Sequence, residues 1–243
     1  MNDLMLFVLL GLGTGALTAL LALGVVGEYK ASGVVNFAHG AIAMFCAYCY
    51  TSLRTSGELV LPVVVLPHRV PLAGAGLQAA PAMVITLVYS ACLGAGLYLA
   101  IFRWLRHAPA LAKVVASIGL MLSLQALALI HFGSQAQPTP AVLPNEPITV
   151  LGASVGRDRL YLAGIAIAAA VVLAAVYRFT KFGVVTRAVA QNERAASLLG
   201  WWPVRTEVGN WAIASFLAGL AGVLAAPIVS LESGTVPRTL CWT

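Results

Sequence analysis

Residues 187–200 read RAVAQNERAASLLG, a polar stretch between two strongly apolar segments of a chain that is 60% hydrophobic. Its alanines and leucines predict a helix that rests one face on apolar surroundings, while Arg187, Gln191 and Arg194 share the other face. Gly200 is expected to end this helix as a C-cap glycine. A helix of this kind between membrane spans suits docking on another protein; the alternative is a linker helix lying in the lipid interface.

The composition places the chain in a membrane. Only 9% of the 243 residues are charged, which a water-facing surface does not tolerate. The first apolar run, residues 4–26, is long enough to cross a bilayer and lacks the basic start and small-residue cleavage site of a signal peptide. We predict an all-α, polytopic transmembrane helical bundle with about six spans. The expected spans are residues 4–26, 34–53, 81–102, 114–132, 160–177 and 208–230.

Two connecting segments carry many prolines. Residues 54–80 contain the patch LVLPVVVLP, which is too short and too rich in proline to cross as a helix, so an interfacial or re-entrant piece is expected. In the loop of residues 133–159, four prolines forbid a regular helix and ITVLGASV could form a short hairpin. This loop either offers a surface to an external partner or is a plain connector.

The basic residues predict the orientation. Nine of the 14 lie on one side of the expected spans, namely Lys30, Arg103, Arg106, Lys113, Arg178, Lys181, Arg187, Arg194 and Arg205. Five lie on the other side: Arg54, Arg69, Arg157, Arg159 and Arg238. Because short basic loops stay in the cytoplasm, residues 187–200 are expected inside and the amino terminus outside. The basic residues are scattered and not interleaved with aromatics, so the net charge of +6 does not indicate nucleic acid binding.

A second polar group lies in Gly33–Gly40, GVVNFAHG. Asn36 and His39 are three residues apart and share a face if this segment is helical. An unsatisfied amide or imidazole in hydrocarbon is costly, so these side chains need partners. They either face a water-filled path or bond between helices near the cytoplasmic interface.

The sequence gives little support for an enzyme or for an ion-coupled transporter. The sequence has no GxSxG, HExxH or GxxxxGK[ST] motif, and none of its eight acids lies centrally in an expected span. Glu193 and Glu207 are interpreted as solvated helix charges. The four cysteines are interpreted as small membrane-buried residues. Glycines of the first, third and sixth spans are expected at helix contacts, namely Gly11, Gly13, Gly15, Gly94, Gly96, Gly219 and Gly222.

Two stretches of the chain resemble those of a known protein family. GLGTGALTALLALG followed by GVVNFAHGAIAMFCAY, and later RAVAQNERAASLLGWWPVRTEVGNWAIASFLAGLAGVLAAP, resemble the permease subunits of bacterial branched-chain amino acid ABC importers of the LivH type. The resemblance covers most of residues 10–230. It implies a single transmembrane permease domain over residues 1–243, located in the inner membrane, that catalyses no reaction and binds no cofactor, because partner subunits bind the ATP.

The resemblance also implies partners and site residues. The partners are cytoplasmic ATPase subunits, a second permease subunit and a periplasmic solute-binding protein. Asn36 and His39 would lie near the translocation path. The residues assigned to an ATPase-coupling helix are Arg187, Asn192, Ala195, Ala196 and Gly200.

The sequence departs from the family pattern in two places. Family members continue into further apolar spans, whereas this chain stops at ESGTVPRTLCWT, so we expect a carboxy-terminally truncated or frameshifted fragment, or a reduced variant. Trp201 and Trp202 replace the more usual Ile or Val and suit an interfacial anchor. Import of urea or a short amide, a channel or secondary carrier without an ATPase, and an inert fragment stay open as alternatives.

Overall fold

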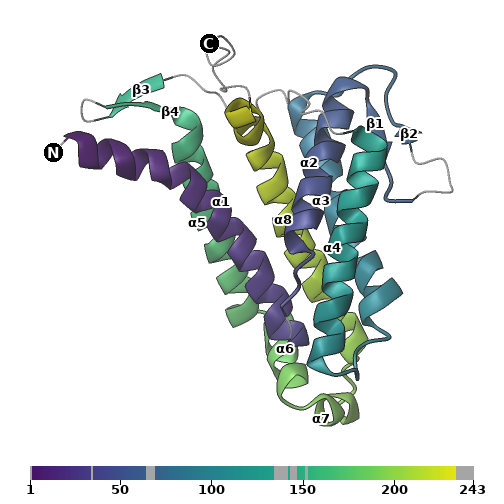
Figure 1. The fold of residues 1–243 in the computed structure, drawn as a ribbon. Helices are drawn as coiled ribbons and strands as arrows, with labels where there is room; N and C mark the ends of the chain where they lie inside the picture. Colours follow the sequence, from purple (N-terminus) through teal and green to yellow (C-terminus); the bar gives the residue numbers. More distant parts are fainter. Residues whose placement is uncertain are drawn as a thin grey trace, which may run out of the picture.

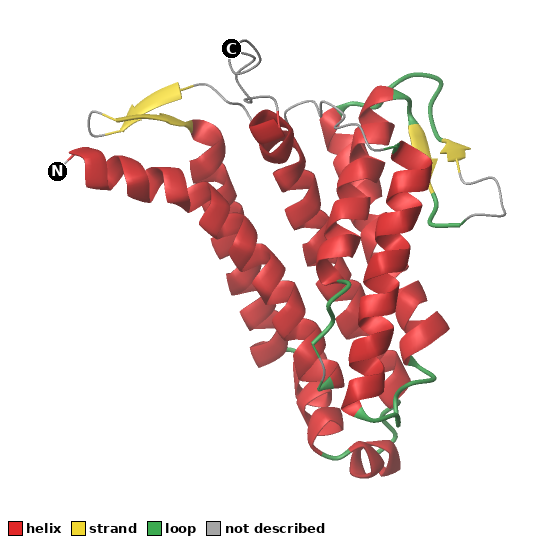
Figure 2. Ribbon diagram, viewed as in Figure 1, coloured by secondary structure: helices red, strands yellow, loops and turns green. Residues whose placement is uncertain are grey.

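The computed structural model describes residues 2–33, 35–63, 69–133, 142, 147–150 and 153–233. Helices dominate the described chain, and short strands occur only at one end (Figure 2). The long helices are α1 (Asn2–Ser32), α2 (His39–Thr55), α3 (Ala79–Leu97), α4 (Ala110–Phe132), α5 (Arg157–Phe179) and α8 (Pro203–Ser233). The π-helical turn η1 (Tyr98–Phe102) continues α3, and two short helices, α6 (Lys181–Gln191) and α7 (Glu193–Leu198), join α5 to α8.

The predicted all-α membrane bundle is confirmed, with one long helix at each of the six expected spans. Within the described residues, five helices are long and apolar enough to cross a membrane. The sixth, α2, has 17 residues and is about 26 Å long, somewhat shorter than a hydrocarbon core of about 30 Å. Its side chains are mostly buried, because it packs against α3, α4 and α8.

Helix α8 lies at the centre of the bundle, in contact with α1, α2 and α3 (Figure 1). Trp211, Ala218 and Leu224 along it are almost completely buried. A side chain at Gly222 would overlap the backbone of Ala43 in α2, and one at Gly94 in α3 would overlap Ser215. The expected glycine contacts are therefore found at these positions. No neighbouring atom of the described chain approaches Gly11, Gly15 or Gly96 closely.

Two antiparallel hairpins cover the end of the bundle that holds the amino terminus (Figure 1). The first pairs β1 (Glu58–Val60) with β2 (Arg69–Pro71), and the second pairs β3 (Pro147–Val150) with β4 (Ala153–Gly156). The hairpin expected in ITVLGASV is thus confirmed. The described part of residues 54–80 connects α2 to α3 through a hairpin, and residues 64–67, the last four of the LVLPVVVLP patch, lie outside the described residues.

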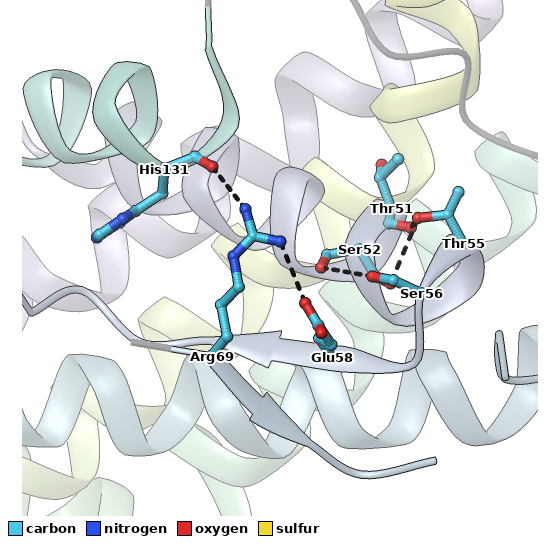
Figure 3. A network of polar contacts seen from close by, with 7 residues as sticks. All are labelled: Thr51, Ser52, Thr55, Ser56, Glu58, Arg69 and His131. Atoms are coloured by element: carbon cyan, nitrogen blue, oxygen red, sulfur yellow. Dashed lines mark hydrogen bonds and ion pairs between the residues drawn. The ribbon is translucent and has the colours of Figure 1, made fainter. Parts of the chain in front are cut away.

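The β1–β2 hairpin is tied to the bundle by Arg69 (Figure 3). Its guanidinium lies 3.1 Å from the Glu58 carboxylate and donates at 3.2 Å to the backbone carbonyl of His131 near the end of α4. Beside it, the Thr55 and Ser56 hydroxyls each donate at 2.9 Å to carbonyls of the last turn of α2. The His131 carbonyl lies in the last turn of α4, where carbonyls lack an intrahelical partner, and Arg69 supplies a donor to it.

The loops divide between the two ends of the bundle as the basic residues predicted. The helices α6 and α7 lie at one end, opposite the amino terminus and both hairpins (Figure 1). Of the cysteines interpreted as small membrane-buried residues, Cys46 and Cys49 are buried inside the bundle, and Cys92 is exposed on the outer surface of the candidate span that contains α3. Cys241 and the rest of the carboxy-terminal tail lie outside the described residues.

Candidate functional site

The stretch expected to form one helix over residues 187–200 forms the end of α6 and all of α7 instead. The break falls at Asn192, whose backbone N–H donates to the carbonyl of Ala188 at 3.0 Å and closes α6. Its side-chain oxygen accepts a hydrogen bond from the N–H of Ala195 at 3.0 Å and opens α7. The prediction of a single helix is wrong because asparagine stabilises a helix start better than a helix interior.

Gly200 ends α7, as the sequence predicted. Its φ of +83° lies in the left-handed region that favours glycine. The N–H of Gly200 donates to the Ser197 carbonyl at 3.0 Å, and the N–H of Trp201 donates to the Ala196 carbonyl at 3.1 Å. These two bonds form a Schellman motif, which turns the chain sharply from α7 toward α8.

A small apolar core holds α7 on α6. Ala196 is 1% exposed and packs against Val185 and Val189. Leu198 and Leu199, which were expected to rest on apolar surroundings, are 89% and 78% exposed. The tip of this helix pair therefore presents two uncovered leucines to its surroundings, with Ala195 exposed nearby.

Arg187 has a structural contact at the corner between α5 and α6. Its guanidinium donates to the carbonyl of Tyr177 at 2.7 Å, in the last turn of α5. Cations favour helix carboxy termini because the terminal carbonyls carry partial negative charge. This contact fixes the direction in which α6 leaves the bundle.

Asn210 links three helices at the same end of the bundle. Its side-chain oxygen accepts from the Tyr177 hydroxyl at 2.5 Å, and its amide donates to the Thr186 hydroxyl at 3.2 Å. These bonds connect α5, α6 and α8. The role of Asn210 was not predicted from the sequence, although an asparagine within the apolar run of α8 is a recognisable signal.

Arg106 forms a second link between the helix pair and the spans. Its guanidinium lies 2.9 Å from the Glu193 carboxylate in α7 and 3.2 Å from the Glu207 carboxylate in α8. Glu207 also accepts a 2.6 Å hydrogen bond from the hydroxyl of Tyr98 in η1. The interpretation of Glu207 as a solvated charge is wrong, because its side chain is only 11% exposed. Glu193 is 40% exposed and paired.

A cavity of about 290 Å³ lies beside these ion pairs. Tyr98, Phe102 and Trp211 form its aromatic walls. Its charged lining consists of Lys30, Arg106, Lys113, Glu193 and Glu207. The cavity is therefore lined by residues of α7 and of five other elements, α1, η1, α4, α6 and α8.

The structure brings His39 together with Glu28. The His39 Nδ1 atom lies 3.4 Å from the Glu28 carboxylate, and both side chains are almost fully buried. The imidazole packs over Gly24 of α1, where any side chain would overlap it. Its Nε2 atom has no hydrogen-bond partner within the described part of the chain.

Asn36 precedes α2 instead of sharing a helix face with His39. Its side-chain oxygen accepts from the N–H of Ala38 at 3.0 Å, close to the start of α2. Asn36 is buried, and its carbonyl accepts from the N–H of His39 at 3.4 Å. The two residues therefore lie at an entry turn packed against α1 and α4, where the N–H of Phe37 donates to Ser117 at 3.4 Å.

Taken with its long apolar helices, this architecture defines a multi-pass α-helical membrane protein with a helix pair projecting from one end of its bundle. The described residues contain no group of three His, Cys, Asp or Glu side chains that could hold a metal ion. The sequence profile of the family described as "Branched-chain amino acid transport system / permease component" matches residues 7–237. The chain belongs to this family of ABC transporter permeases, which is a family of transport proteins and not of enzymes.

Curated relatives agree with this assignment. The chain is 24% identical to the high-affinity branched-chain amino acid transport system permease protein LivH of Salmonella typhimurium and 25% identical to that of Escherichia coli. It is 23% identical to the corresponding protein BraD of Pseudomonas aeruginosa. Each comparison covers 88% of this chain and 68% of the relative. No solved structure matches the chain.

Proposed function

We propose that this chain is the translocation subunit of an importer for branched-chain amino acids, driven by ATPase subunits that seat on α6 and α7. The main support for the proposal is that the helix pair α6–α7 is anchored to the spans but exposes apolar side chains at its tip. Its tip exposes Leu198 and Leu199, while polar contacts tie α6 and α7 firmly to the spans. Exposed apolar side chains on an anchored helix suit docking on a protein partner.

The proposed coupling runs through the contacts described above. A displacement of α7 would be transmitted to α6 through the packing of Ala196. It would pass from α6 to α8 through the hydrogen bond between Thr186 and Asn210. Arg106 gives a parallel connection to η1 and α8. The ATPase can switch the bundle between outward-open and inward-open states only if it binds the two states with different affinity.

The remaining partners belong to the same proposal. A periplasmic solute-binding protein would deliver the amino acid at the end that carries the hairpins and the amino terminus. A second permease subunit would complete the translocation unit in the inner membrane. The ATP would be bound by the ATPases, so this chain would need no cofactor. Asn36 and His39 are proposed to lie near the translocation path, since buried polar groups in membrane spans commonly mark one.

The test is co-purification of the chain with its candidate ATPase from detergent-solubilised membranes. Leu198→Ser combined with Leu199→Ser is expected to release the ATPase and abolish uptake while membrane insertion stays normal. Leu72→Ser, which changes a leucine that is 50% exposed at the opposite end, is the matched control and is expected to retain both. Wild-type ATPase recovery and uptake in the double variant would refute the proposed docking surface.

A further inference from the structure

A groove of about 470 Å³ lies between the start of α6 and the start of α8, beside the turn at Gly200. Lys181 and Arg205 contribute the charges in its lining, and Trp201, Trp202 and Phe182 contribute aromatic surface. Among the residues that the structure describes, its lining includes no carboxylate. The groove is therefore basic at its charged positions and apolar elsewhere.

The placement of Lys181 is unfavourable for the helix that carries it. It is the first residue of α6, where the helix presents its positive end, and the first turn of α6 contains no acidic residue. The Thr180 hydroxyl caps this helix but carries no charge. Helix amino termini favour negative charge, so a lysine there adds to a positive potential that no acidic residue of the first turn offsets. An external anion near Lys181 would offset both charges.

Arg205 faces the same groove and is held in place by an aromatic ring. Its guanidinium carbon lies 5.1 Å from the centre of the Trp202 ring. A guanidinium stacked on an aromatic face retains its N–H donors, which match the oxygens of a phosphate well. No ion pair to Lys181 or Arg205 is found in the described part of the chain.

The groove lies beside the ends of two candidate membrane spans, α5 and α8. Lys181 lies two residues beyond the end of the apolar helix α5, and Arg205 lies two residues inside the start of α8. Trp201 and Trp202 are 46% and 65% exposed, as expected of aromatic residues at a membrane interface. A phosphate bound here would lie at headgroup level, with its acyl chains free to enter the bilayer.

We propose that this groove binds an anionic phospholipid, whose phosphate lies between Lys181 and Arg205 and whose glycerol and upper acyl segments contact the tryptophans. A lipid held there would bridge α6 and α8 beside the Gly200 turn and restrain the angle between them. The site is independent of the solute that the protein transports. The proposed transmission of movement from α7 to the spans would then depend on the bound lipid.

The test is native mass spectrometry of the detergent-purified chain titrated with phosphatidylglycerol or with phosphatidylcholine of the same acyl chains. Because each basic residue near an anionic headgroup contributes about five-fold in affinity, the wild type should prefer phosphatidylglycerol by about 25-fold. Lys181→Gln with Arg205→Gln should remove this preference. Lys181→Arg with Arg205→Lys keeps both charges and should retain it.

Arg103→Gln with Arg178→Gln is the matched control. It removes the same charge from the same end of the bundle, and each of these arginines also lies over an aromatic ring, at 5.9 Å from Trp104 and 5.6 Å from Phe179. This variant should keep the full preference. An equal loss in both glutamine variants, or no preference in the wild type, would overturn the site. Displacement of the lipid by millimolar inorganic phosphate would also overturn it, in favour of a free-anion site.

Discussion

At the scale of single residues, Arg106 has the most consequential position in the structure. It lies in the turn between η1 and α4 and is only 13% exposed, with the carboxylates of Glu193 and Glu207 on either side. Glu207 depends on it, because a buried carboxylate that loses its cation keeps its desolvation cost without the compensating attraction. One side chain thus holds three segments together.

Arg106→Gln is expected to destabilise the protein by about 3 kcal/mol, in the range found when one partner of a buried ion pair is removed. Glu58→Gln is the control, since it breaks the exposed pair with Arg69 and should cost about 1 kcal/mol or less. Thermal unfolding in detergent, followed by tryptophan fluorescence, measures both. Equal shifts in melting temperature would show that Glu207 does not depend on Arg106.

At the scale of elements, α7 is too short to be stable alone. It has six residues, and isolated helices of that length do not persist in water. Its order comes from the Asn192 cap, the Gly200 turn and the contact of Ala196 with α6. Each of these supports is a single residue, so each can be tested separately.

Asn192→Ala removes the cap of α7 and should cost about 1 kcal/mol of local helix stability. If α7 must be folded to bind the ATPase, the affinity of the two proteins should fall by up to about five-fold. Asn192→Asp keeps a capping oxygen and should bind normally. Binding of the detergent-solubilised chain to the immobilised ATPase measures the difference, and identical affinities for both variants would argue against a role for α7 order.

Gly200→Pro is expected to uncouple ATP hydrolysis from uptake, because proline cannot adopt the positive φ on which the turn after α7 depends. Gly200→Asn should retain coupling, since asparagine tolerates this conformation better than other non-glycine residues. Charge reversal at Arg187 should also uncouple, by placing a carboxylate against the Tyr177 carbonyl. The measurement is the ratio of solute taken up to ATP hydrolysed in proteoliposomes. Normal uptake by Gly200→Pro at wild-type protein levels would contradict the coupling proposal.

At the scale of the whole molecule, α8 connects the two ends of the bundle. It carries Glu207 and Asn210 beside α6 and α7, and continues through the core between α1, α2 and α3 (Figure 1). Its close contacts at Gly219 and Gly222 leave little room for independent motion. A displacement imposed at α7 is therefore expected to move α8 as a rigid body.

The orientation of the whole bundle can be tested by labelling with a membrane-impermeant maleimide. Ser197→Cys, in a background where Cys92 and Cys241 are alanine, should react only from the cytoplasmic side. Ser56→Cys, at the opposite end, should react only from the periplasmic side, because retention of short basic loops sets the orientation. Both positions are exposed in the structure. The reverse labelling pattern would show that the amino terminus is cytoplasmic.

Several features follow from the sequence alone because they depend on local chemistry. A long apolar run predicts a membrane helix whatever its neighbours are, so each expected span coincides with an observed helix, with differences of up to six residues at the ends. The Gly200 cap and the second hairpin were also predictable, since each depends on conformational preferences of adjacent residues. The gathering of most basic residues at one end of the bundle was also predictable, because it follows from their positions between the apolar runs.

Other features were decided by the tertiary structure, because they depend on residues that are distant in the chain. Tyr98 and Glu207 are 109 residues apart, and no local pattern indicates that they form a hydrogen bond. The burial of Glu207 follows from that contact and from Arg106. Leu198 and Leu199 lie in a pattern typical of a buried helix face, and only the break at Asn192 and the direction of α7 leave them exposed. The sequence determines which segments are helical and enter the membrane, whereas long-range packing determines which charges pair and which apolar side chains stay uncovered.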